Sequence, residues 1–110
     1  MRKFGRKKNQ RRAFLKSLAT NLILKEKIKT TEARAKELRS LVEHLISYAK
    51  KEDLASYRSL TKRLSAAAAK KLVKEISPRF KERKGGYVRL TRLGQRLSDG
   101  AKMVYIELIK

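Results

Sequence analysis

The stretch that decides the fold is MVYIELI, residues 103–109. Val104, Ile106 and Leu108 alternate with Met103, Tyr105, Glu107 and Ile109. Side chains of a β-strand point to opposite faces in turn, so this alternation predicts a strand with one apolar face. The strand needs neighbours, because an isolated strand or hairpin is at best marginally stable in water.

Two further segments supply those neighbours. Tyr87 to Leu93 reads as a strand, and the loop 94–100 with its Asp99-Gly100 turn signal joins it to residues 103–109 as a hairpin. Residues 27–31, Lys-Ile-Lys-Thr-Thr, are β-branched and alternating, which predicts a short strand added to the hairpin.

The rest of the chain has helical periodicity. Apolar residues recur every three or four positions in four stretches, which end near Lys25, Lys50, Leu64 and Pro78. The third stretch has Leu54, Tyr57, Leu60, Thr61 and Leu64 on its predicted inner face. The pattern leaves open whether the third and fourth helices are separate or form one bent rod.

Polar residues at the starts of these stretches predict where the helices begin. Asn9, Thr30 or Thr31, Asp53 and Ser65 can each cap a helix N-terminus. Proline disfavours helix in the residue before it, so the fourth helix is expected to stop at Pro78. Residues 1–8 show no apolar periodicity. They are predicted to form an extended basic arm, followed by a single globular domain over residues 9–110.

The charge balance is strongly basic. The 110 residues include 31 Lys and Arg against 10 Asp and Glu, a net charge of +21. Residues 1–25 hold nine basic residues and no acid, and residues 76–97 hold seven basic residues and only Glu82. Such a charge attracts polyanions, and arginine in particular can meet phosphate oxygens in two hydrogen bonds. Residues 26–75 mix both signs and read as a solvated surface.

These two basic segments supply the candidate RNA-binding residues. They are Arg2, Lys3, Arg6, Lys7, Lys8, Arg11, Arg12, Lys16, Arg79, Arg83, Lys84, Arg89, Arg92 and Arg96. Tyr87 is a further candidate for stacking on a base, although a tyrosine that begins a strand is more often part of the packing.

The chain offers little for catalysis. It contains no cysteine, and its one histidine, His44, has no acidic residue at metal-ligand spacing. No paired carboxylates, phosphate-binding loop or nucleophile elbow is present, so neither an enzyme nor a cofactor or small-molecule substrate is expected. No apolar run approaches the roughly 20 residues of a membrane span, which favours a cytosolic protein.

Five motifs in order resemble the bacterial large-subunit ribosomal protein seventeen family. They begin with Gly5-Arg6-Lys7 and residues 12–20, and continue with residues 28–39. They resume at Pro78-Arg79-Phe80, at Gly85 to Arg89, and at Leu93-Gly94 and Asp99 with Met103 to Leu108. The segment between Lys7 and Arg12 is shorter than is usual in the family and lacks its histidines.

The resemblance implies an α/β (α+β) fold with helices packed on a small three-stranded mixed sheet. It also implies that the partners are large-subunit ribosomal RNA and neighbouring ribosomal proteins, among them the one numbered thirty-two. Ribosome association in the cytoplasm follows.

Two other function classes remain open at this point. A DNA-binding architectural protein would share the charge, but it is expected to carry a basic recognition helix or a wedge, whereas residues 31–50 mix signs. A small enzyme acting on nucleic acid would need an acid/base or metal constellation.

Overall fold

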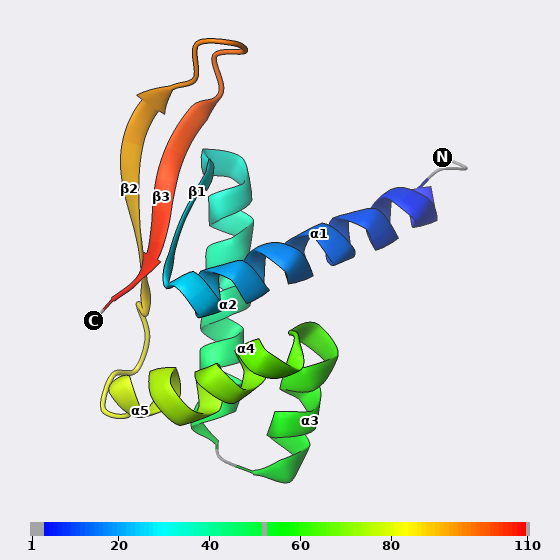
Figure 1. Cartoon of the computed structure of the whole chain (residues 1–110), viewed down its shortest axis with the longest axis vertical. Helices are drawn as coiled ribbons and strands as arrows, with labels where there is room; N and C mark the ends of the chain where they lie inside the picture. Colours follow the sequence, from blue (N-terminus) through cyan, green and yellow to red (C-terminus); the bar gives the residue numbers. More distant parts are fainter. Residues whose placement is uncertain (1–3, 52, 110) are drawn as a thin grey trace.

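A three-stranded sheet lies beside a set of helices in the computed structural model, which describes residues 4–51 and 53–109 (Figure 1). The strand predicted from MVYIELI is β3 (Lys102–Leu108), and it is central. It pairs on one side with β1 (Lys27–Thr31) and on the other with β2 (Val88–Gln95). The predicted α+β class is confirmed.

Both strand pairings are antiparallel, so the expected mixed sheet is wrong in this detail. The hairpin makes β2 and β3 antiparallel through its own turn. The direction of β1 is set by the helices that precede and follow it, and the strand pattern does not encode that direction. Ile28 faces Ile106 and Thr30 faces Val104, so the apolar positions of both strands share one face.

The hairpin is longer than predicted. Strand β2 extends past Leu93 to Gln95, because the register shifts between Arg92 and Gly94 and the ladder then continues. Gly94 has φ 97°, a conformation open to glycine, so the predicted start of the loop is the site of a β-bulge.

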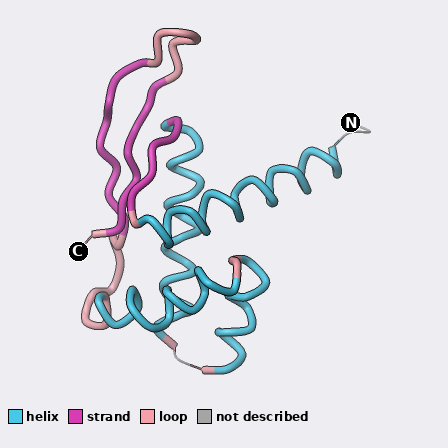
Figure 2. The backbone as a smooth tube through the Cα atoms, in the orientation of Figure 1, coloured by secondary structure: helices cyan, strands magenta, loops and turns pink. Residues whose placement is uncertain are grey.

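Helices form the other layer of the molecule (Figures 1 and 2). The long ones are α1 (Phe4–Lys25) and α2 (Glu32–Lys50), and α3 (Leu54–Arg63) is shorter. The last helical run consists of α4 (Ala66–Lys71), a π-helical turn η1 (Leu72–Ile76) and α5 (Ser77–Arg79).

Three of the predicted helix caps are confirmed. The side chains of Thr31, Asp53 and Ser65 accept hydrogen bonds from backbone N–H groups three residues later. Leu64 has extended backbone angles, φ −135° and ψ 163°, so α3 and α4 are separate helices.

Three local predictions differ from the structure. Helix α1 begins at Phe4, not at Asn9, so residues 4–8 are helical and the predicted extended arm is wrong for them. Lys, Arg and Gln are good helix formers even where nothing apolar repeats. Pro78 lies inside α5, where the wide π-helical turn before it relieves the clash of the proline ring with the preceding turn. Leu54 and Tyr57 are 63% and 37% exposed and Thr61 is exposed too, so only Leu60 and Leu64 of the predicted inner face of the third helix are buried.

Helix α2 is the centre of the core. Its apolar stripe is fully or almost fully buried and consists of Ala35, Leu38, Val42, Leu45, Ile46 and Ala49. The inner face of the sheet contributes Val104, Ile106 and Leu108, and α1 contributes Leu22 and Ile23. Burial of this apolar surface is the main stabilising contribution to the fold.

Truncation of core side chains is expected to lower the free energy of unfolding. Leu38→Ala and Ile106→Ala each remove a side chain with no exposed surface, and such cavities cost about 2–5 kcal/mol. Urea denaturation measures the change. Leu97→Ala is the control, because Leu97 is fully exposed and its loss should change the unfolding free energy by under about 0.5 kcal/mol.

Candidate nucleic-acid interface

The basic first half of α1 leads away from the rest of the molecule (Figure 1). Arg6, Lys7 and Lys8 belong to its first turns, whereas Arg2 and Lys3 lie outside the described residues. Farther along the helix, Arg11, Arg12 and Lys16 are exposed. The helix thus places Arg6, Lys7 and Lys8 at its start and Arg11, Arg12 and Lys16 farther along.

Two contacts brace this helix against α2. Arg11 forms an ion pair with Glu37, and the guanidinium of Arg34 lies 4.4 Å from the ring centroid of Phe14. Arg11 therefore already has a carboxylate partner. Arg12 and Lys16 have no ion pair among the described residues and line an open groove together with Lys62 and Arg63 of α3.

The arginines of the hairpin differ in their surroundings. Arg89 donates from Nε and Nη2 to Glu107 Oε1, at 3.0 and 2.7 Å, across the ladder between β2 and β3. Arg92 makes no ion pair within the described part of the chain. It lies near the start of α2, where the pKa of Glu32 is lowered first by Lys36 and also by the charges of Arg92 and Lys102.

The hairpin tip has an internal ion pair. Arg96 donates to both carboxylate oxygens of Asp99, at 3.0 and 2.7 Å, and the N–H of Ala101 donates to Asp99 Oδ1 at 3.1 Å. These hydrogen bonds, above all that from Arg96, lower the pKa of Asp99 to about 2. Arg96 and Asp99 therefore both stay charged in mildly acidic solution, and their ion pair stabilises the turn.

Arg79 anchors the end of the helical run. It donates to Glu26 at 2.6 Å, and Lys71 lies 3.2 Å from the same carboxylate. Glu26 has φ 67°, the left-handed conformation that follows a helix C-terminus, and its N–H reaches the carbonyl of Leu22. A glutamate in this position ties the end of α1 to the last helices.

The loop after α5 holds Arg83 and Lys84 near Tyr87. The Tyr87 hydroxyl donates to the carbonyl of Arg83 at 3.0 Å, and its ring centroid lies 5.0 Å from that of Phe80. Tyr87 is only 2% exposed. Base stacking by Tyr87 is therefore excluded in this structure, and its packing role is confirmed. Arg83 and Lys84 themselves are exposed.

The candidate residues thus do not form one patch. The described candidates lie on α1, at the end of α5 and in the loop after it, and on the hairpin, and Figure 1 shows these elements on different sides of the molecule. Sequence reasoning missed Lys62 and Arg63, because it treated residues 26–75 as one mixed segment. A narrower window carries the signal, since residues 54–74 contain six basic residues and no acid.

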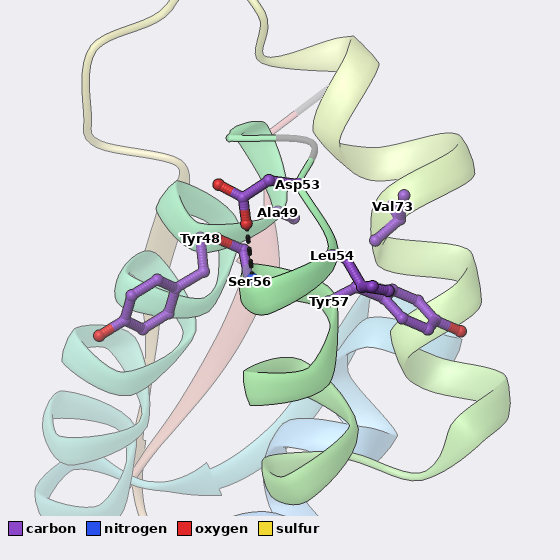
Figure 3. A pocket seen from close by; sticks show the side chains of 7 residues that line it. All are labelled: Tyr48, Ala49, Asp53, Leu54, Ser56, Tyr57 and Val73. Atoms are coloured by element: carbon purple, nitrogen blue, oxygen red, sulfur yellow. Dashed lines mark hydrogen bonds between the residues drawn. The ribbon is translucent and has the colours of Figure 1, made fainter.

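A shallow pocket between α2, α3 and η1 offers no catalytic arrangement (Figure 3). Among the described lining residues the one carboxylate is that of Asp53, which accepts a hydrogen bond from the N–H of Ser56 at 2.7 Å. This bond lowers the pKa of Asp53 and makes it the cap of α3. Leu54, Tyr57 and Val73 supply apolar lining. His44 lies on the exposed face of α2.

Residues 4–51 and 53–109 contain neither a cluster of metal-binding side chains nor a helix suited to cross a membrane. No group of three His, Cys, Asp or Glu side chains there is placed to hold a metal ion. None of the helices in that part of the chain combines the length and apolar character of a membrane-spanning segment.

Comparison with known proteins decides the family. The model of the family described as ribosomal protein L17 matches residues 14–109. The chain belongs to the ribosomal protein L17 family. It is 50% identical to the large ribosomal subunit protein bL17 of Staphylococcus epidermidis and to that of Staphylococcus aureus, each over 98% of both chains. The bL17 protein of Staphylococcus haemolyticus is also 50% identical, over 98% of this chain and 97% of its own.

Membership in the L17 family confirms the resemblance seen in the sequence. The family is one of structural ribosomal proteins, so this chain is a ribosomal protein associated with the ribosome in the cytoplasm. The chain and these relatives match over almost their full lengths, so the family assignment covers the hairpin as well as the helices.

The Glu26 cluster predicts a pH-dependent contribution to stability. Arg79, and then Lys71, lower the pKa of Glu26 in the folded protein. Its ion pairs therefore stabilise the fold above the ordinary carboxylate pKa, and this stabilisation is lost as pH falls through the lowered value. Glu26→Gln should lower the free energy of unfolding at pH 7, and the difference from wild type should shrink in acid.

Urea denaturation at a series of pH values measures this effect. Glu75→Gln is the control, because Glu75 is exposed and has no ion pair within the described residues. It should leave the unfolding free energy at pH 7 nearly unchanged. A Glu26→Gln deficit of constant size down to strongly acidic pH would show that the ion pairs are not its cause.

Proposed function

We propose that this protein is a structural constituent of the large ribosomal subunit that binds ribosomal RNA through the basic end of α1 and the arginine-rich hairpin. The observation that carries the proposal is the pair of basic projections, the first half of α1 and the hairpin, on a member of the L17 family. No catalytic step is part of this function.

The first projection suits insertion between RNA helices. Residues 1–8 are proposed to act as an arm attached to the domain 9–110, and Arg2, Lys3, Arg6, Lys7 and Lys8 are proposed to contact phosphates. Each phosphate that such a residue neutralises releases counterions, so the affinity should fall steeply with salt concentration.

The second projection is the hairpin, and its arginines differ in whether an acidic side chain is already paired with them. Arg89 and Arg96 share their guanidinium groups with Glu107 and Asp99, so a phosphate that binds them meets a nearby carboxylate. Arg92 has no such partner among the described residues. Its charge is therefore proposed to contribute more to RNA binding than that of Arg89.

The loop after α5 is the third proposed contact. Arg83 and Lys84 are exposed there and lie before Gly86, which has φ 65°.

Neighbouring large-subunit proteins, among them the one numbered thirty-two, are proposed to cover part of the remaining surface. A high-salt wash of large subunits tests the whole proposal, since a subunit constituent should remain in the pellet.

Two arginine substitutions test the hairpin. Arg92→Ala should weaken binding to large-subunit ribosomal RNA and lower the slope of log K against log salt by about one unit, as expected for one lost phosphate contact. Arg89→Ala should have a smaller effect on the slope, because Glu107 offsets the charge of Arg89.

The measurement is a filter-binding titration at several salt concentrations. The control is Lys74→Ala, which removes one exposed positive charge at a distance from the hairpin. If Arg92→Ala and Lys74→Ala gave the same slope of log K against log salt, Arg92 would not contact the RNA backbone. A preference of the wild type for duplex DNA over structured RNA at matched salt would instead favour the DNA-binding alternative.

A further inference from the structure

An open groove of about 530 Å³ lies between α1 and the C-terminal end of α3. Four basic residues stand on its two walls, and three apolar residues add to the lining. The α1 wall carries Arg12 and Lys16, the α3 wall carries Lys62 and Arg63, and the apolar lining comes from Ala13, Leu15 and Leu41. No acidic residue lines the groove within the part of the chain that the structure describes.

The two walls are held together by a specific contact. Arg12, Lys16 and Thr20 are spaced by four residues, so they follow one another along one face of α1. Thr20 Oγ1 accepts a hydrogen bond from the N–H of Ser65 at 3.4 Å. This bond fixes the turn after α3 against α1 and brings Lys62 and Arg63 to the side of the groove opposite Lys16.

The charges of the groove lack internal partners. None of the four basic residues forms an ion pair with any residue that the structure describes. The nearby Arg11 differs, since it is paired with Glu37. Arg63 is held by an aromatic ring instead, with its guanidinium carbon 5.5 Å from the centroid of Tyr48.

We infer that this groove binds a segment of the ribosomal RNA backbone, an inference that rests on the proposed function. A single phosphate group carries about two negative charges at most and would leave part of the four positive charges unneutralised. A nucleic-acid strand supplies successive phosphates to both walls, and the apolar lining residues suit the faces of its sugars.

One further feature favours RNA over an acidic protein segment. The groove continues the basic first half of α1, which is itself a proposed RNA contact. The groove therefore extends the RNA-binding surface from the projecting end of α1 to α3.

Lysine footprinting tests the inference on the full-length chain. The protein is treated with an acetylating reagent, free and bound to large-subunit ribosomal RNA, and each lysine is quantified by mass spectrometry. Lys16 and Lys62 should lose at least about fivefold of their reactivity on binding. Lys70 of α4 is the internal control, because it is exposed and lies outside the groove, and it should stay reactive.

A pair of double variants provides an independent measurement. Lys62→Ala with Arg63→Ala should lower the salt slope of RNA binding by about two units. Arg58→Ala with Lys70→Ala removes the same charge from exposed positions outside the groove and should lower the slope by less than half as much. Equal slopes for the two double variants would overturn the inference.

The outcomes separate the groove from the function as a whole. If the wild type failed to bind large-subunit RNA, the proposed function would fail and the groove with it. If it bound while Lys16 and Lys62 kept their reactivity, only the groove would be rejected. If Lys16 and Lys62 were protected from acetylation in the intact subunit but not on RNA alone, the groove would be assigned to a protein neighbour. That result would also overturn the inference.

Discussion

The contact between the apolar stripe of α2 and the inner face of the sheet is the constraint on which the rest of the structure depends. Val104, Ile106 and Leu108 of β3 are buried, and β1 and β2 add Ile28 and Val88 on either side. Helices α1, α4 and η1 close the other sides of α2 through the same core. Both basic projections are therefore held at one end only, and their free ends extend past this core (Figure 1).

The few acidic residues of the chain act mainly as anchors for basic ones. Glu26 binds Arg79 and Lys71, and Glu37, Glu107 and Asp99 each bind an arginine. Exposed ion pairs of this kind contribute little to stability individually, so their main consequence is to position long side chains. The net charge of +21 therefore hides a difference between basic residues that an acid neutralises and basic residues that have no such partner. Arg92 and the four basic residues that line the groove between α1 and α3 are among the positions with no ion pair to a described residue.

Much of the fold could be predicted from local patterns. Alternation over residues 103–109 identified the central strand, and Thr31, Asp53 and Ser65 identified three helix starts, because both signals depend only on near neighbours in the chain. The direction of β1 could not be predicted, since it depends on how distant helices place the strand. The role of Tyr87 was settled by Phe80 and the Arg83 carbonyl, contacts that spacing alone does not determine.

The basic surface was harder to predict than the fold, because a charge count does not show which charges are paired. Arg89 matched the family pattern, yet the register of β2 and β3 places it beside Glu107. Lys62 and Arg63 were missed for the opposite reason, since acids elsewhere in residues 26–75 hid their acid-free neighbourhood. Pairing across strands and between helices is a property of tertiary structure, and it decides which charges are available to a partner.

The start of α1 connects fold and function. Its first half contains few apolar residues, and basic residues at positions 7 and 11, 8 and 12, and 12 and 16 are spaced by one helical turn. Like charges at this spacing destabilise a helix by a few tenths of a kcal/mol per pair, or about the amount that an opposite pair contributes. Phosphates that neutralise these residues would remove the repulsion. Under the proposed function, RNA binding and helix formation in this segment are therefore coupled, and the helical backbone from Phe4 onward is the conformation that such binding favours.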